Sequence, residues 1–230
     1  ARGRVQSARF GGPGREPVRI IEHADVRRML MTVKAFTEAA RAIAYLNASA
    51  VDRAHAEPDV ARRAEAQALA DLLTPVTKAF STDIGVEMSS LALQVFGGMG
   101  FVEETGAAQH YRDSRIAPIY EGTNGIQAID LVGRKLPMEG GRHWRALLQR
   151  ERQFVAGLPR SGELGQMVPY LEDAIEALQT ASVWISGNEG ERLADTAAGA
   201  TPYLRMFGLT LGGTLLARQA AEAVRRLETG

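Results

Sequence analysis

The sequence predicts an all-α fold, and three observations predict it. Long stretches place apolar residues three and four positions apart, which is the spacing of one helix face. No alternating apolar and polar run of convincing length indicates a strand. The composition is that of an ordinary globular chain, since 45% of the 230 residues are apolar and 23% are charged. We therefore expect a helical bundle.

The first long helix follows a loop. Residues 10–17 contain three glycines and two prolines, which cannot continue a helix. From residue 23 to about residue 56, an unbroken apolar stripe predicts a helix. Pro58 and Asp59 suit the first turn of the next one, where a missing amide costs nothing and a carboxylate meets the positive end of the dipole.

The second apolar stripe contains two features that predict interruptions. Pro75 lies inside the stripe and should kink the helix. Residues 81–83, Ser-Thr-Asp, offer an N-cap for a third helix that runs to Phe96. The first half of the chain is therefore expected to supply three helices.

Helical patterning resumes in the last third of the chain. Residues 171–185 carry one apolar stripe, and Thr201-Pro202 reads as a cap followed by proline at the first position of the final helix. Gly208 and Gly212 are four positions apart in that helix, so they fall on one side. We expect them to let a neighbouring helix cross at short range.

Charge and composition exclude several function classes. The 27 basic residues balance the 27 acidic ones, so no net field favours nucleic acid or an anionic membrane. Cysteine is absent, which excludes disulfides and thiolate chemistry, and the four histidines show no metal-ligand spacing, so no metal site is expected. No run approaches the length of a membrane span and no signal peptide is evident, so we expect a soluble, cytoplasmic chain.

Glycine is concentrated in the middle of the chain. Nine of the 24 glycines lie from residue 97 to residue 141, which predicts close backbone approach to another group. The run Gly97-Gly98-Met99-Gly100 is not a dinucleotide fingerprint, because it follows a helix and position 103 is Glu. It is better read as a helix that stops at a double glycine.

Glu121 is the candidate general base. It follows the apolar stretch 116–120 and precedes Gly122, which predicts a partly desolvated carboxylate. The alternative is a structural acidic residue stabilised at the start of a helix. From the residues alone, both interpretations stay open.

Three motifs occur in order along this segment. They are Gln-x-x-Gly-Gly-x-Gly-Phe from Gln94, Arg112-Asp113, and Ile-Tyr-Glu-Gly-Thr-Asn-x-Ile-Gln ending at Gln127. Their order and spacing closely resemble the C-terminal domain of the acyl-CoA dehydrogenases. Residues 142–230 are similar to the extra helical region of a subgroup that includes 3-methylmercaptopropionyl-CoA dehydrogenases.

The resemblance implies an up-and-down helical bundle with extra C-terminal helices and a flavoenzyme activity. The enzyme would oxidise an acyl-CoA thioester to its trans-2-enoyl product. Glu121 would remove the pro-R α-proton, while the β-hydrogen leaves as hydride to the flavin. Tyr120 and Gly122 would flank the thioester.

The resemblance also implies FAD as cofactor and a homodimer or homotetramer as the active unit, because part of the FAD site belongs to a neighbouring subunit. Electrons would pass to an acceptor such as electron-transfer flavoprotein. The residues expected to contact FAD are Arg4, Gln6, Gln94, Gly97, Gly98, Thr123, Asn124 and Gly125.

The sequence departs from the family pattern at a few positions. Ser7-Ala8 replaces the usual Phe-Gly after Arg-x-Gln, and Gly125 stands where many members have Glu or Gln. We expect residues 1–141 to form the C-terminal bundle domain and residues 142–230 a helical extension. The N-terminal α and middle β domains of the family are expected to lie outside this chain, and the isolated fragment is expected to be inactive.

Two other functions remain open from the sequence. One is a non-catalytic helical module that mediates oligomerisation through the extension. The other is an acyl-CoA oxidase, which would use the same base but pass electrons to oxygen.

Overall fold

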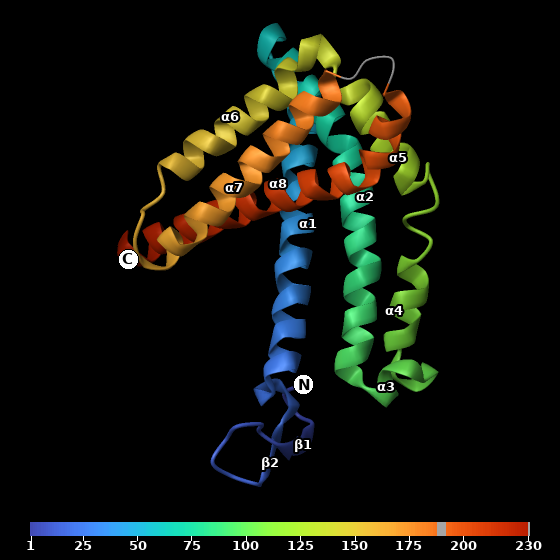
Figure 1. Cartoon of the computed structure of the whole chain (residues 1–230), viewed down its shortest axis with the longest axis vertical. Helices are drawn as coiled ribbons and strands as arrows, with labels where there is room; N and C mark the ends of the chain where they lie inside the picture. The colour runs from blue at the N-terminus through green and yellow to red at the C-terminus, as the bar shows by residue number, and fades with distance from the viewer. Residues whose placement is uncertain (188–191, 230) are drawn as a thin grey trace. The chain divides into compact units, whose positions relative to one another are not determined.

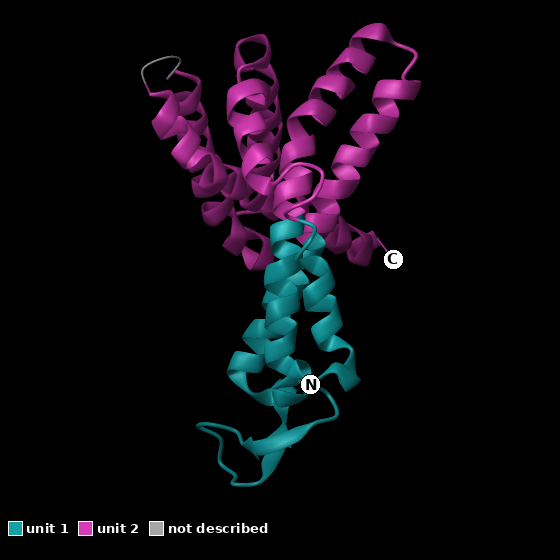
Figure 2. Cartoon of the chain, turned by 90° about the vertical axis from the view of Figure 1, so that its right-hand side faces the viewer, with its two compact units in different colours: residues 1–38, 82–117 teal, residues 39–81, 118–230 magenta. Residues whose placement is uncertain are grey.

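The structure is a computed structural model that describes residues 1–187 and 192–229, and it confirms the all-α class (Figure 1). The chain forms two compact units, coloured separately in Figure 2. Unit 1 comprises residues 1–38 and 82–117, and unit 2 comprises residues 39–81 and 118–230. The two longest N-terminal helices, α1 (Ala24–Ala56) and α2 (Val60–Phe96), each contribute residues to both units.

Unit 1 begins with a small hairpin that the sequence analysis did not predict. Strands β1 (Val5–Ala8) and β2 (Pro17–Arg19) pair antiparallel, with an irregular register between their ends. The Gly/Pro-rich segment predicted as a loop connects them. Each strand has only three or four residues, which is too short to show a period-2 pattern.

The remaining elements of unit 1 are short. The 3-10 turn η1 (Ile20–Glu22) leads into α1. After α2 come α3 (Gly98–Phe101), η2 (Glu103–Thr105) and α4 (Ala107–Ser114). The predicted end of a helix at the double glycine is confirmed, since α2 stops at Phe96.

Unit 2 contains the C-terminal helices. The segment α5 (Asn124–Asp130) continues as the π-helical stretch η3 (Leu131–Lys135), and η4 (Met138–Gly141) follows. Then come α6 (Arg142–Ala156), α7 (Gly162–Ser186) and α8 (Leu193–Thr229). The division at residues 141 and 142 stays a prediction.

The core of the C-terminal helices is apolar and continuous. α7 packs against both α6 and α8. Their shared cluster consists of Val155, Leu158, Val168, Leu171, Ile175 and Ala217, with Phe154, Met167 and Ala221 at its edge. The predicted close crossing at α8 is confirmed, because a Cβ on Gly212 would lie 2.9 Å from the Cβ of Ala39 and one on Gly208 would overlap Phe80.

Two predicted helix boundaries are wrong. α2 continues through residues 81–83, and the Ser81 hydroxyl is buried without a hydrogen-bond partner, so it caps nothing. Phe80, Ile84 and Met88 are buried at intervals of four and continue one stripe. Burial of this stripe outweighs a local capping preference of about 1 kcal/mol.

The predicted cap at Thr201-Pro202 is the second error, since Pro202 lies inside α8. A proline in a helix interior costs about 3 kcal/mol. Tyr203, Leu204 and Phe207 are buried directly after it, and each buried side chain of this size contributes about 1.5–3 kcal/mol. The helix therefore continues.

Two further findings concern the described part of the chain. None of its helices combines the length and the apolar character needed to cross a membrane. Within residues 1–187 and 192–229, no group of three or more His, Cys, Asp or Glu residues could hold a metal ion.

Candidate functional site

Unit 1 brings Arg4 and Gly97 together. The Arg4 Nη1 atom donates a 3.0 Å hydrogen bond to the carbonyl oxygen of Phe96, the last residue of α2. Gly97 follows with a left-handed φ of 65°, and a Cβ there would lie 3.0 Å from Arg4 Nη1. Arg4 thus satisfies a carbonyl at the helix end, where cations are favoured. Its guanidinium has five N–H donors, so one bond leaves capacity for a ligand.

The backbone of Gln6 is held by His23, a residue for which no role was predicted from the sequence. The His23 ring Nε2 lies 2.7 Å from the Gln6 carbonyl oxygen. This contact fixes the backbone of β1, and the residue Gln6 itself is exposed. Ser7 next to it has a left-handed φ of 58°, at the irregular point of the hairpin.

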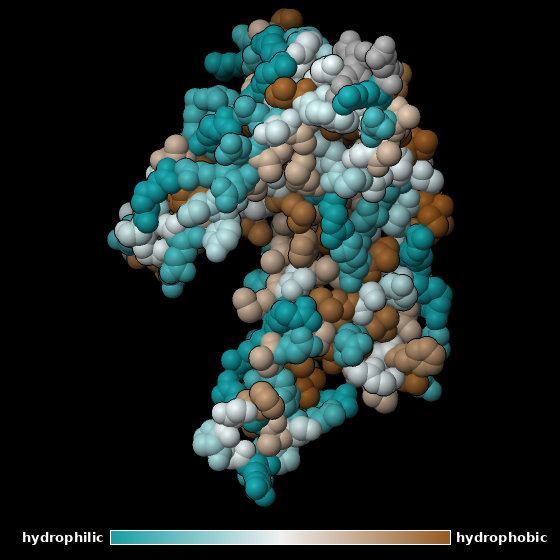
Figure 3. Space-filling view, viewed as in Figure 1, coloured by the Kyte–Doolittle hydropathy of each residue, from teal (hydrophilic) through white to brown (hydrophobic). Residues whose placement is uncertain are grey.

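The double glycine presents open backbone. Gln94 and Gly98 are exposed, and a Cβ on Gly98 would meet no atom within 4 Å. Apolar side chains surround this backbone, with Phe96, Met99 and Phe101 exposed by 47, 55 and 87%. Apolar side chains also reach the surface among polar ones on the face drawn in Figure 3. Large apolar side chains left open to water are typical of surfaces that another molecule covers.

The Arg-Asp motif forms a polar network on α4. Arg112 Nη2 lies 2.5 Å from Glu103 Oε1, and Arg112 Nη1 donates to Gln109. Gln109 in turn donates to Asp113 at 2.6 Å. These contacts hold η2 against α4, so the motif has a structural role in unit 1.

In unit 2, Glu121 and Gly122 form a left-handed pair. Their φ angles are 54° and 85°. Glycine adopts this region freely, but for a residue with a Cβ it costs roughly 1–2 kcal/mol. A strained non-glycine residue persists only where its surroundings enforce it, and such residues cluster at functional sites.

Two side chains hold the carbonyl oxygens of this pair. Lys78 Nζ donates a 2.7 Å hydrogen bond to the Gly122 oxygen, and Gln127 Nε2 donates a longer one, 3.5 Å, to the Glu121 oxygen. The role of neither residue was predicted from the sequence. Gln127 stands at the end of the third motif, which was the available signal for it, whereas Lys78 is a single lysine among the mostly apolar residues 72–80.

Asn124 and Thr123 anchor the same segment at the start of α5. Thr123 is the N-cap, and its hydroxyl accepts from the Ile126 amide. Asn124 Oδ1 accepts from Lys78 Nζ at 2.8 Å, and its Nδ2 donates to the Ala79 oxygen at 3.1 Å. The polar groups of the Asn124 side chain are therefore used within the chain.

The expected desolvation of Glu121 is wrong for this chain. Glu121 is exposed, and the preceding Ile119 and Tyr120 are themselves 48% and 51% exposed. Neighbours in the sequence can exclude water only when they fold over the carboxylate, and here they do not. Gly122 and Gly125 are exposed as well, so the backbone beside the carboxylate is accessible.

The predicted site residues thus fall into two groups. Arg4, Gln6, Gln94, Gly97 and Gly98 belong to unit 1. The residues from Tyr120 to Gly125 belong to unit 2.

Two protein-family models match parts of this chain. Residues 13–136 match the family model described as the C-terminal domain of acyl-CoA dehydrogenase. The chain belongs to the acyl-CoA dehydrogenase family. Residues 147–230 match a second model, described as acetyl-CoA dehydrogenase C-terminal like.

Curated members of the acyl-CoA dehydrogenase family are similar along nearly the whole chain. The 3-methylmercaptopropionyl-CoA dehydrogenase of Ruegeria pomeroyi is 41% identical over 231 residues, which cover 100% of this chain and 39% of that protein. A butyryl-CoA dehydrogenase of Syntrophomonas wolfei is 33% identical, over 97% of this chain and 37% of that protein. The chain therefore spans about two fifths of the length of these relatives.

Solved structures of acyl-CoA dehydrogenases share the fold. Caenorhabditis elegans ACDH-11 in complex with C11-CoA superposes with a TM-score of 0.72 at 22% identity, covering 86% of this chain and 32% of that one. An acyl-CoA dehydrogenase from Bacillus anthracis complexed with FAD gives 0.65 at 18% identity, covering 89% and 38%. These likenesses concern the fold.

Proposed function

We propose that this chain supplies the C-terminal part of an FAD-dependent acyl-CoA dehydrogenase, which converts an acyl-CoA thioester into a trans-2-enoyl-CoA. In this proposal residues 1–141 form the bundle domain and residues 142–230 an added helical extension. The observation that carries it is Glu121, which is exposed with a left-handed backbone on a segment braced by Lys78 and Gln127. Family membership supplies the reaction class.

Glu121 acts as the base in this proposal. An ionised carboxylate accepts the α-proton of the thioester at one oxygen, which is general-base catalysis. Tyr120 and Gly122 flank the thioester and help to fix its position relative to that oxygen. The water exclusion that Glu121 lacks in the chain alone comes from bound substrate and cofactor. FAD, when bound, accepts the β-hydrogen together with its two electrons, so the substrate loses one proton and one hydride.

The residues present fit a flavin dinucleotide. The exposed Gly98 backbone has open space where a side chain would otherwise project, and Gln94 beside it is exposed. Arg4 offers a cation with unused donor capacity, which suits a diphosphate. We assign Arg4, Gln6, Gln94, Gly97 and Gly98 to this role.

A second set of cofactor contacts is assigned to the start of α5. Thr123 and Gly125 are exposed and can meet the cofactor directly. The side chain of Asn124 is engaged by Lys78 and the Ala79 carbonyl, so its contribution to the cofactor is support of the segment.

The proposal also covers the oligomeric state of the enzyme, its substrate, its electron acceptor and its cellular compartment. The exposed apolar residues beside the double glycine support a homodimer or homotetramer, in which a neighbouring subunit covers them. The substrate is an acyl-CoA, as the names of the relatives suggest. Electrons pass to an acceptor such as electron-transfer flavoprotein, and the enzyme acts in the cytoplasm.

Anaerobic flavin spectroscopy on the full-length native polypeptide tests this proposal. Adding 3-methylmercaptopropionyl-CoA, butyryl-CoA or an eleven-carbon acyl-CoA to the FAD-loaded protein should bleach the visible flavin band and yield the enoyl-CoA. Free CoA should leave the band unchanged. Absence of bleaching with all three thioesters would contradict a dehydrogenase, and stoichiometric peroxide release in air would instead indicate an oxidase.

A further inference from the structure

Lys78 connects α2 to the segment that carries Glu121. Its ammonium donates to the Gly122 carbonyl oxygen at 2.7 Å and to Asn124 Oδ1 at 2.8 Å. Asn124 returns a hydrogen bond to the carbonyl oxygen of Ala79, the residue after Lys78. The Lys78 side chain is half-buried. Two charge-assisted hydrogen bonds from Lys78 and one hydrogen bond from the Asn124 side-chain amide thus join α2 to residues 122–124 within unit 2.

Lys78 holds the backbone of residues 121–122 through its hydrogen bond to the Gly122 carbonyl oxygen. The peptide between Gly122 and Thr123 follows two successive left-handed residues, Glu121 and Gly122. A residue with a Cβ leaves this region readily when no tertiary contact holds it there. The φ angle of Glu121 sets the direction of its side chain, so releasing the segment would redirect the carboxylate.

Gln127 cannot replace Lys78 in this role. Its bond to the Glu121 oxygen is 3.5 Å long, at the limit for a hydrogen bond, and it comes from α5, the helix that the segment itself precedes. Lys78 comes from a separate long helix whose neighbouring residues Val76, Ala79 and Phe80 are buried. The position of residues 121–124 is therefore set by their hydrogen bonds to α2.

We propose that Lys78 is a positioning residue for Glu121: its ammonium fixes the left-handed Glu121–Gly122 backbone and thereby aims the carboxylate at the α-carbon of the acyl-CoA. This inference rests on the proposed function. Lys78 itself contacts neither substrate nor cofactor in this assignment.

Kinetics of the full-length FAD-loaded polypeptide form the first test. Lys78→Met keeps the aliphatic stem but removes every donor, and should slow flavin bleaching by acyl-CoA about 10- to 100-fold, with KM and FAD content within about twofold of wild type. Lys78→Arg should recover part of the rate. Lys34→Met, the same change at an exposed position of α1, should have no effect.

A double-mutant comparison separates positioning from general destabilisation. In a Glu121→Gln background, Lys78→Met should cause no further loss of rate, because no carboxylate remains to be aimed. An undiminished additional loss would overturn the proposal. So would a wild-type bleaching rate in Lys78→Met.

Amide hydrogen exchange provides a readout that does not depend on catalysis. In Lys78→Met, exchange of residues 119–124 should accelerate about 10-fold or more, while α7 and α8 keep their protection. If exchange accelerates but the wild-type protein never bleaches with acyl-CoA, the proposed dehydrogenase function is contradicted, while the role of Lys78 in holding residues 121–122 is supported. Unchanged exchange would contradict that role of Lys78. Should Lys78→Met not fold, Lys78→Gln replaces it, and loss of the fold in both would contradict a positioning role.

Discussion

Gly208 of α8 lies directly against the aromatic ring of Phe80 in α2, so closely that a Cβ on residue 208 would overlap three ring carbons. Both residues belong to unit 2, and Phe80 is almost fully buried. Glycine is needed here for close approach and not for an unusual backbone angle. The crossing brings α8 against the same stretch of α2 that carries Lys78.

Gly208→Ala should therefore destabilise the fold. Overpacking a tight core typically costs about 1–3 kcal/mol, which exceeds the gain of about 1 kcal/mol from the better helix propensity of alanine. The matched control is Gly199→Ala in the same helix, where a Cβ would meet no atom within 4 Å and the substitution should be neutral or stabilising. Urea midpoints of both variants provide the measurement. Equal stabilisation by both would show that the contact is not tight.

Glu151 should be the most costly acidic residue to remove from the C-terminal helices. It is 2% exposed, its Oε1 accepts from Arg150 at 3.0 Å, and its Oε2 accepts from Arg218 at 3.1 Å. Glu151→Ala leaves both guanidinium groups without their carboxylate, and we expect a loss of about 3 kcal/mol, the lower end for a broken buried pair because both arginines are partly exposed. Thermal unfolding tests this against Glu176→Ala, an exposed glutamate of α7, which should change little.

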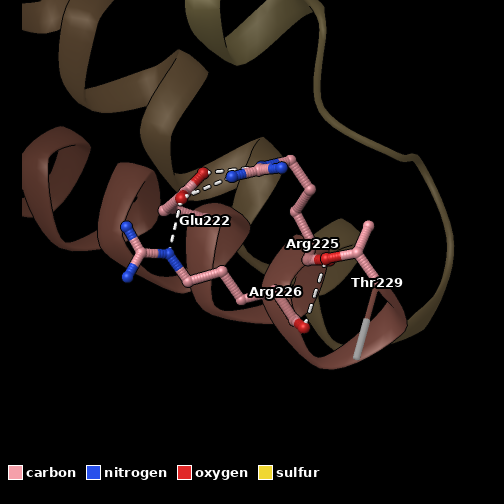
Figure 4. A network of polar contacts seen from close by, with 4 residues as sticks. All are labelled: Glu222, Arg225, Arg226 and Thr229. Atoms are coloured by element: carbon pink, nitrogen blue, oxygen red, sulfur yellow. Dashed lines mark hydrogen bonds and ion pairs between the residues drawn. The ribbon is translucent and has the colours of Figure 1, made fainter.

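The end of α8 should respond to acid through Glu222. Its carboxylate accepts hydrogen bonds from Arg225 and Arg226, which lower the pKa of Glu222 to about 2 (Figure 4). Because the folded pKa lies below the unfolded value, the stabilisation is complete above about pH 4.5 and is lost as the pH falls toward 2. The protection factors of the amides at residues 222–229, which compare the observed exchange with the intrinsic rate at each pH, should fall over that window in the wild type. Glu222→Gln should show low protection factors already at pH 6; an identical pH dependence of protection in the two proteins would contradict the pairing.

The periodic elements were predictable because helical spacing is a local property. The stripe from residue 23 predicted α1, and the spacing of Gly208 and Gly212 predicted a close helix crossing. The continuity of α2 and α8 was not predictable from Ser81 or Pro202. A cap or a proline is a local signal. Both helices continue because their apolar faces are buried against other parts of the chain, which a local signal does not show.

In the candidate site, too, residues within a contiguous motif were predictable, whereas residues that reach the site from distant parts of the sequence were not. Glu121 and its neighbours could be found from the motifs because they are contiguous. Lys78 and His23 could not, since their hydrogen bonds to Gly122 and Gln6 join residues 44 and 17 positions apart. The exposure of Glu121 also escaped prediction, because sequence neighbours show what is near a carboxylate but not whether it is covered.

Arg4 should contribute to FAD affinity in the full-length native polypeptide. Losing one charge-assisted contact to a phosphate costs about 1.5–3 kcal/mol, so Arg4→Gln should raise the Kd for FAD about 10- to 100-fold. Arg2→Gln, the same change two residues away at an exposed position, is the matched control and should not alter the Kd. Flavin fluorescence titration measures both. Equal Kd values for the two variants would remove Arg4 from the cofactor site.

Anaerobic stopped-flow absorbance of Glu121→Gln tests most directly whether the Glu121 carboxylate takes the α-proton. The amide keeps the size of the side chain but cannot accept the proton. We predict that the full-length variant binds FAD and acyl-CoA as the wild type does, and that flavin bleaching slows by about 10²–10⁴-fold. Bleaching at the wild-type rate would contradict the account.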